Sequence, residues 1–297
     1  MARFLDRVAL FCVGSLVLFQ VSCAEESSRL VGPKVLFKVT VPPDPLEETY
    51  LDPIVLIQDN KFQSPSPFSS FFPLFKKEFL TQDKSYTLFQ NGSVRGTVHP
   101  HRFIMQECNG EELVTGKSQF STASYERDYE SKEASFLASN QVVSVSKSLE
   151  VTEKDTQALL ALGRQHYKQA GFPPSAVERL KVSSVQKRDL LDNQSPFLVA
   201  SLELPFSEKQ GVDDVFGAML IIAHHQGLEL IEDLATSAKE TELYQFVGVD
   251  DIDGDGAGEL IMQKMPYYSD AGYEYQIMKW AQDKWTVIYT GGGSGGC

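Results

Sequence analysis

The sequence predicts an α+β fold that is predominantly β. Short runs rich in branched and aromatic residues, separated by turn residues, fill most of the chain. One long segment, residues 152–170, carries apolar residues at helical spacing instead. The chain has 297 residues, of which 42% are hydrophobic and 11% aromatic, so it can bury a sizeable core.

Residues 24–150 are expected to form a β-rich N-terminal domain. Residues 35–41 (VLFKVTV) form a strand that ends at two prolines, and residues 134–145 indicate another strand region. The clearest hairpin has strands at 86–90 and 93–98 around Asn91-Gly92, a pair that favours positive φ in a two-residue turn. The Ser-, Pro- and Phe-rich residues between 62 and 75 are expected to be irregular.

Residues 151–182 are expected to form a short helical divider between two β regions. Thr152 is placed as the N-cap of the long helix, with Asp155 three residues later, as in a capping box. The helix should end at Gly171, before two prolines, and a shorter helix is expected at 175–180. The apolar stripe of the long helix includes Leu159, Leu160, Leu162 and Tyr167.

Residues 183–297 are expected to form antiparallel, blade-like meanders, the last four strand runs making one of them. A faint internal repeat supports this organisation. A shift of 62 residues brings Asp189 onto Asp251 and Leu198 onto Leu260. The sequence leaves open whether this region holds one blade or two.

The segment Asp251-Ile-Asp-Gly-Asp-Gly-Ala-Gly-Glu259 has the composition of a calcium-binding loop. Calcium prefers six to eight oxygen ligands, several of them anionic, and alternating carboxylates in a curled loop can converge on one point. Glycines at 254 and 256 permit the curl. Four carboxylates within nine residues repel one another unless a cation neutralises them. The expected ligands are Asp251, Asp253, Asp255, Glu259 and the backbone carbonyl of Ala257.

The loop is not an EF-hand, because its twelfth position is Met262 and strands are expected on both sides. It resembles the D-x-D-G-D-G-x-x-[DE]-L loop of FG-GAP/VCBS-type calcium-binding repeats, over roughly one blade at residues 244–290. The whole chain is also similar to uncharacterised exported bacterial proteins. The resemblance implies Ca²⁺ held for a structural purpose and names no activity.

Residues 1–23 resemble a signal peptide, with a basic start at Arg3 and Arg7 and an apolar run at 8–19. Two cleavage alternatives remain. Ordinary signal peptidase would cut after Ala24, whereas a lipobox would make Cys23 the lipidated first residue. In both cases the protein is expected to be exported: periplasmic, on the cell surface or secreted. A membrane contact is expected only through a lipid anchor at Cys23.

Cys108 and Cys297 are expected to form a disulfide, because an exported protein meets an oxidising environment. The alternative is two free thiols. The glycine-rich residues 291–296 are expected to act as a flexible tether for the last cysteine.

The net charge of −13 argues against nucleic acid as a partner and agrees with a bound cation. The sequence has no G-x-S-x-G nucleophile elbow between a strand and a helix, no H-E-x-x-H motif and no P-loop. The sequence therefore predicts a calcium-stabilised binding or scaffolding protein of the cell envelope, with an unknown protein or envelope partner. The alternative is an exported hydrolase with a structural calcium site.

Overall fold

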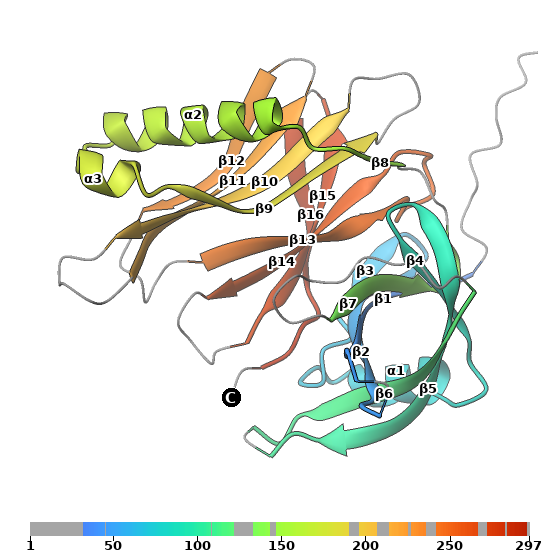
Figure 1. The fold of residues 1–297 in the computed structure, drawn as a ribbon. Coiled ribbons are helices and arrows are strands. Elements are labelled where there is room, and N and C mark those ends of the chain that lie inside the picture. The colour runs from blue at the N-terminus through green and yellow to red at the C-terminus, as the bar shows by residue number, and fades with distance from the viewer. Residues whose placement is uncertain are drawn as a thin grey trace, which may run out of the picture.

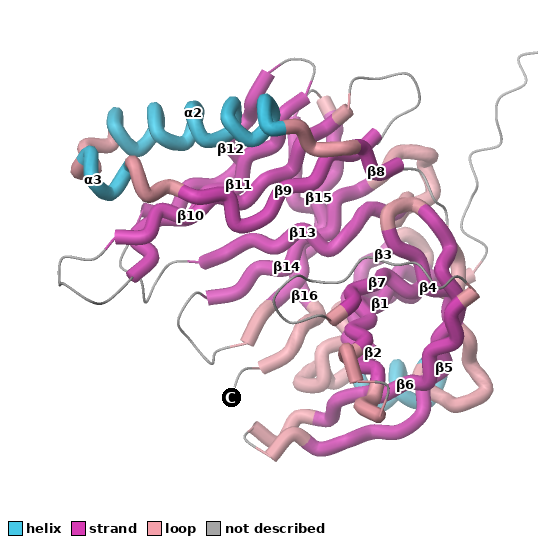
Figure 2. The backbone as a smooth tube through the Cα atoms, in the orientation of Figure 1, coloured by secondary structure: helices cyan, strands magenta, loops and turns pink. Residues whose placement is uncertain are grey.

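The computed structural model describes residues 32–44, 46–107, 109–121, 133–142, 147–189, 196–206, 214–224, 227–235, 242–266, 272–282 and 284–295. Within these ranges strands far outnumber helices, and they form three antiparallel sheets (Figures 1 and 2). This confirms the predicted α+β, predominantly β class.

The first sheet closes on itself. Its order is β1-β7-β4-β5-β6-β2-β3, and β1 also pairs with β2, so six strands form a cylinder and β3 extends one edge. These strands are β1 (Lys34–Val41), β2 (Thr49–Gln58), β3 (Lys61–Gln63), β4 (Tyr86–Gln90), β5 (Ser93–Met105), β6 (Glu112–Phe120) and β7 (Ala134–Ser139). We call this unit the closed sheet.

Successive side chains of β1 point alternately into two hydrophobic cores, one on each face of the closed sheet. Val35, Phe37 and Val39 belong to the core inside the closed sheet. Leu36, between them, belongs to a second core that packs against the C-terminal sheet. Since successive side chains of a strand point to opposite faces, one strand contributes to both cores.

Helix α1 (Phe72–Phe79) overlaps the end of the segment 62–75 that was expected to be irregular, so that expectation was wrong for residues 72–75, as it was for residues 62–63 in β3. Pro73 takes one of the first helical positions, where its missing N–H costs nothing. Phe72 and Phe75 are buried in the core of the closed sheet, with the ring centroids of Phe75 and Phe37 6.2 Å apart. Burial of this aromatic face stabilises a helix too short to form alone.

The hairpin around Asn91-Gly92 is confirmed. It joins β4 to β5, and the two turn residues have φ values of 56° and 72°. Both values lie in the left-handed region that the two-residue turn requires, and Asn and Gly tolerate that region best.

The second sheet, in the order β12-β11-β10-β9-β8, carries two helices. The capping box of α2 is present as predicted, since Thr152 accepts from the Asp155 N–H and the Asp155 side chain accepts from the Thr152 N–H. Figure 1 shows α2 lying across one face of this sheet, where Leu159 and Tyr167 pack on Ala200 and Leu202. The elements are β8 (Lys147–Leu149), α2 (Glu153–Gln169), α3 (Pro174–Val177), β9 (Lys181–Asp189), β10 (Phe197–Phe206), β11 (Asp214–His224) and β12 (Gly227–Ala235).

The third sheet is the predicted C-terminal meander, and it is buried on both faces. Leu260 and Met262 of β14 pack towards the second sheet, whereas Ile261, between them, packs towards the closed sheet. The third sheet is therefore the central layer of the molecule. Its strands are β13 (Glu242–Asp250), β14 (Glu259–Pro266), β15 (Glu274–Ala281) and β16 (Lys284–Gly291).

Two antiparallel meanders follow each other in the described C-terminal residues, the first within the five-stranded second sheet and the second forming the third sheet. They are β9 to β12 and β13 to β16, and they pack face to face through Val199, Leu220, Leu260 and Met278. The shift of 62 residues seen in the sequence carries β9 onto β13 and β10 onto β14 to within two residues. The acidic loop joins β13 to β14, and its counterpart after β9 lies outside the described residues.

The glycine-rich end is docked through residue 295, so the expected flexible tether is wrong for residues 291–295. The Gly292 N–H donates to Ser64 Oγ at 2.9 Å, and the Tyr273 N–H donates to the Ser294 carbonyl at 3.0 Å. A Cβ on Gly293, whose φ is +78°, would lie 2.1 Å from the Tyr273 carbonyl oxygen. Glycine is needed there for both conformation and space.

Candidate cation site in the β13–β14 loop

The acidic loop begins at the last cross-strand pair of β13 and β14, in which Asp250 faces Glu259. The Asp251 carboxylate shapes the curl by accepting hydrogen bonds from the N–H groups of Gly254 (2.7 Å), Asp255 (3.1 Å) and Gly256 (3.0 Å). Gly254 and Gly256 have φ values of 77° and 88°, as the sequence required. The loop therefore folds around one aspartate.

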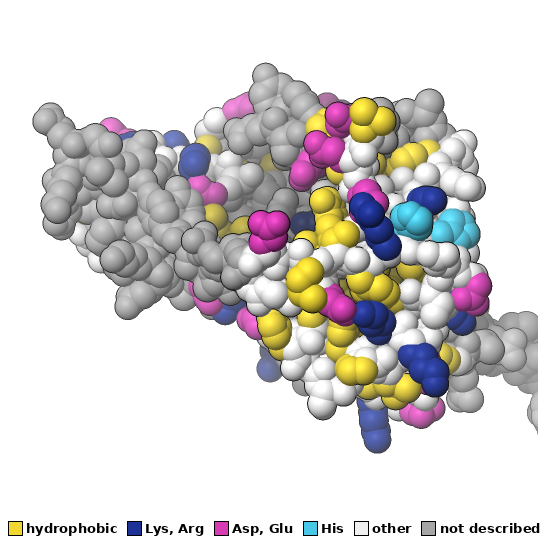
Figure 3. Space-filling model, turned by 90° about the horizontal axis from the view of Figure 1, so that it is seen from below, with side chains coloured by type: hydrophobic (Ala, Val, Ile, Leu, Met, Phe, Trp, Pro, Cys, Tyr) yellow, Lys and Arg dark blue, Asp and Glu magenta, His cyan; other side chains and the backbone are white. Residues whose placement is uncertain are grey.

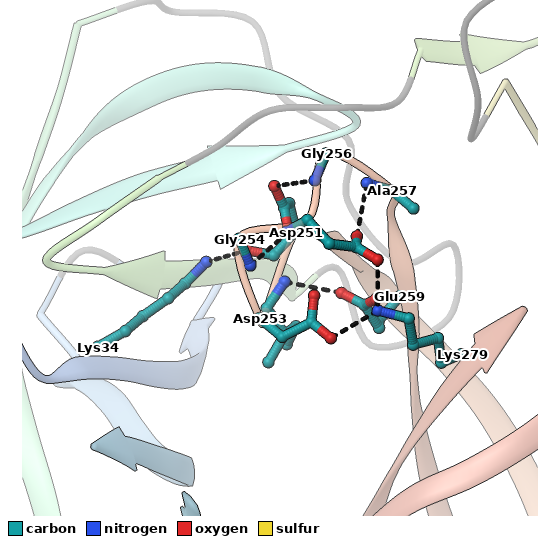
Figure 4. A network of polar contacts seen from close by, with 10 residues as sticks. Lys34, Asp251, Asp253, Gly254, Gly256, Ala257, Glu259 and Lys279 are labelled. Atoms are coloured by element: carbon teal, nitrogen blue, oxygen red, sulfur yellow. Dashed lines mark hydrogen bonds and ion pairs between the residues drawn. The ribbon is translucent and has the colours of Figure 1, made fainter. Parts of the chain in front are cut away.

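Three carboxylates converge inside the loop. One ligand atom each from Asp251, Asp253 and Glu259 lies within 4.8 Å of the other two, and Asp251 and Glu259 are fully buried (Figure 4). Within the described ranges this is the single cluster of His, Cys, Asp or Glu side chains that could hold a metal ion. An acidic turn on the surface would not bury its carboxylates in this way.

A lysine from the neighbouring strand enters this cluster. Lys279 of β15 places Nζ 2.5 Å from Asp253 Oδ2, 2.6 Å from Asp255 Oδ2 and 3.4 Å from Glu259 Oε1 (Figure 4). Burial alone would lower the pKa of Lys279, but the bonds to these carboxylates outweigh it and raise the pKa. Nζ therefore lies where these carboxylates stabilise a positive charge.

One lysine leaves the cluster short of positive charge. Burial raises the pKa of Glu259 to about 8, and the charges of Asp253 and Asp255 add to the rise. Burial also raises the pKa of Asp251, despite the hydrogen bonds that it accepts. Asp253 Oδ1 and Glu259 Oε1 are buried and accept no hydrogen bond from the described residues. A divalent cation would supply both the charge and the missing contacts.

A second lysine ties the loop to the closed sheet. Lys34 of β1 donates from Nζ to the Asp251 carbonyl oxygen at 2.6 Å and pairs with Asp250 Oδ2 at 2.5 Å. Both charged side chains are fully buried. Ile252, the loop residue after Asp251, packs in the core that the closed sheet shares with the third sheet. The loop is therefore part of the contact between these two layers.

Of the five expected ligands, the structure brings Asp251, Asp253 and Glu259 together. Asp255 is more exposed and meets the cluster through Lys279, and the Ala257 N–H donates to Asp255 Oδ1 at 2.9 Å. Sequence reasoning missed Lys34 and Lys279. They lie 217 residues before Asp251 and 26 residues after Asp253, and no motif links such distant positions to the loop.

Cys23, Cys108 and Cys297 lie outside the described residues. None of the described helices has the length and apolar character needed to cross a membrane.

Comparison with known proteins adds no relative. No family model matches the chain, and neither the curated proteins nor the solved structures contain a match.

Proposed function

We propose that this chain is an exported, calcium-stabilised binding or scaffolding protein of the cell envelope. In this proposal residues 251–259 form a structural calcium loop of the FG-GAP/VCBS kind. The observation that carries it is the buried convergence of Asp251, Asp253 and Glu259 around a point where Lys279 already places a cation. Export rests on the signal-like residues 1–23.

The donor set fits Ca²⁺. It consists of carboxylate oxygens, which a hard cation prefers, and two of them accept no hydrogen bond from the described residues. Lys279 is about 20% exposed, so its side chain can rotate towards solvent and leave its place to the ion. Asp251, Asp253, Asp255 and Glu259 would hold the ion, with the Ala257 carbonyl as a further ligand.

The role of such an ion would be structural. The loop joins β13 to β14 in the central layer, and its neighbour Lys34 belongs to the closed sheet. Neutralising the loop would stabilise the contact between these layers. A loop buried in this way between two layers is better suited to bracing the fold than to sensing brief changes in calcium concentration.

Thermal unfolding with and without calcium tests the proposal. Calcium in excess over EGTA should raise the melting temperature by several degrees, because a ligand that binds only the folded state at 100 times its Kd adds about 2.7 kcal/mol. The Asp253→Ala/Asp255→Ala variant should lose the rise. The control Asp83→Ala, at an exposed carboxylate outside the loop, should keep it. Equal melting of the wild type in calcium and in EGTA would refute the site.

One observation favours the alternative, an exported hydrolase with a structural calcium site. A cavity of about 290 Å³ between the closed sheet and the third sheet contains Asp52, whose pKa burial raises to about 6. A hydrolase using this group should lose its activity on fluorogenic ester, phosphate and glycoside substrates in Asp52→Asn. A binding protein should turn over none of these substrates.

A further inference from the structure

The cavity between the closed sheet and the third sheet is separate from the calcium loop. Its volume of about 290 Å³ is at the lower end of the roughly 300–1,000 Å³ of small-molecule sites. The walls come from segments far apart in the sequence: β1, β2, α1, β6, β14 and the docked C-terminal residues. A cavity of this size has room for a small ligand.

Two cross-strand pairs face each other at this cavity. Lys38 and Asp52 are register partners on β1 and β2, and Gln263 and Tyr275 are partners on β14 and β15. Lys38 Nζ donates to Gln263 Oε1 at 2.7 Å, and the Tyr275 hydroxyl donates to Asp52 Oδ2. Tyr273 donates to the same Asp52 oxygen at 2.5 Å. These bonds fix the positions of the polar groups before any ligand arrives.

One carboxylate oxygen of Asp52 is available to accept a hydrogen bond from a ligand. Both tyrosine hydroxyls bond Oδ2, and among the described residues nothing donates to Oδ1. The side chain is half-buried and lines the cavity. A carboxylate oxygen in a confined space accepts most strongly from a cationic donor.

The charges around the cavity favour a cation. Glu111 also lines it and is satisfied by neutral donors only, Ser294 Oγ at 2.7 Å, the Gly295 N–H at 3.0 Å and Asn109 Nδ2 at 3.2 Å. Glu112 is neutralised by Lys76 at 2.5 Å. Asp52 and Glu111 therefore share Lys38, on which Glu133 also acts, so negative charge is in excess at the cavity.

Part of the cavity wall is apolar. Leu51, Pro53, Phe72 and Val114 line the cavity beside the charged groups. Figure 3 shows one face of the molecule, where hydrophobic side chains lie between acidic and basic ones. A fitting ligand therefore combines a positive group with a small apolar body.

We propose that this cavity binds a small organic cation, a primary amine on an apolar body. The amine donates to Asp52 Oδ1 and supplies the missing positive charge, while the apolar body packs on Phe72 and Val114. Carboxylate ligands are repelled by Asp52 and Glu111. This cavity does not use the calcium loop, so calcium-dependent melting and amine binding can fail independently.

Calorimetric titration of the purified protein with benzylamine, benzyl alcohol and benzoate tests the proposal at pH 7.5. The three probes share the ring and differ in charge. Benzylamine should bind saturably, benzyl alcohol at least tenfold more weakly, and benzoate not at all. In Asp52→Asn benzylamine should bind about tenfold more weakly than to the wild type, whereas the exposed control Asp83→Asn should leave its affinity unchanged.

The pH dependence of benzylamine binding to the wild type is a second test, and it does not require that any variant folds. Benzylamine stays cationic between pH 7.5 and 5, whereas Asp52, which faces Lys38, Glu111, Tyr273 and Tyr275, takes up a proton near pH 6. The affinity for benzylamine should therefore fall severalfold as the pH is lowered from 7.5 to 5. Equal binding of benzylamine and benzyl alcohol, a pH-independent affinity, or tighter binding of glucose as a neutral polyol probe would each overturn the proposal.

Discussion

Lys34 and Asp250 form a fully buried ion pair, with 2.5 Å between Nζ and Oδ2, that joins the first strand of the closed sheet to the last residue of β13. A buried charge is tolerated only when a partner neutralises it. This pair therefore makes the seating of β13 against β1 specific, in addition to the apolar contacts around Leu36 and Ile252.

Removal of Lys34 should be strongly destabilising. Lys34→Met leaves Asp250 buried without its counter-charge, and we expect a loss of about 3–5 kcal/mol in the free energy of unfolding measured with urea. Adding Asp250→Asn should recover part of the loss, because the uncompensated charge is removed. Lys61→Met, at an exposed lysine of β3, should change stability very little. A double variant as unstable as Lys34→Met would contradict this account.

Lys279 and calcium should compete for the same carboxylates. In EGTA, Lys279→Met should lower the free energy of unfolding by about 1–3 kcal/mol, since Asp253, Asp255 and Glu259 lose their cation. In saturating calcium the difference should shrink or reverse, and the variant should bind calcium severalfold more tightly. Lys284→Met, at an exposed lysine of β16, is the control. Unchanged calcium affinity in Lys279→Met would show that no competition exists.

Asp52 should make stability depend on pH. Burial raises its pKa to about 6, although hydrogen bonds from Tyr273 and Tyr275 and the charge of Lys38 oppose the rise. The folded state then binds the proton more tightly than the unfolded state, so this contribution is fully present below about pH 4 and is lost as the pH rises through about 6. Asp52→Asn should therefore be more stable than the wild type at pH 8 by about 1–2 kcal/mol, and no more stable at pH 4. Urea unfolding at both pH values measures this, and a stabilisation that is the same at both would contradict it.

The elements predicted correctly from the sequence are those with strong local signals. The Asn91-Gly92 hairpin and the capping box at Thr152 depend on residues within a few positions of one another. Helix α1 was missed because its stability comes from packing Phe75 against Phe37, which lies far away in the sequence, in β1. Local patterns cannot report such contacts.

The same distinction applies to the candidate site. Asp251, Asp253 and Glu259 belong to one short motif, and the structure brings them together as the spacing suggested. Lys34 and Lys279 reach the loop only because three sheets pack in layers. The cavity around Asp52 is likewise a product of packing, since its charged groups come from strands that are distant in the sequence.

The predicted disulfide between Cys108 and Cys297 would join two segments of the chain that hydrogen bonds already hold together. Asn109 Nδ2 donates to the Gly295 carbonyl oxygen at 2.7 Å, and the Gly295 N–H donates to Glu111 Oε2 at 3.0 Å. The first bond joins the residue after Cys108 to the residue two positions before Cys297, and the second joins that same residue to the third residue after Cys108. We expect peptide mass spectrometry of unreduced protein to find the two cysteines linked.

Loss of this link should destabilise the protein by about 2–5 kcal/mol, because it closes a long loop of the chain. Cys108→Ser, Cys297→Ser and the double variant should be equally destabilised without reductant, since any one of these changes removes the bridge. Reduction should bring the wild type to the same stability and leave the variants unchanged. Quantitative alkylation of both thiols in protein purified without reductant from an oxidising compartment would instead establish the two free thiols. The docked residues 292–295 would then be held by their hydrogen bonds to Ser64, Asn109, Glu111 and Tyr273 alone.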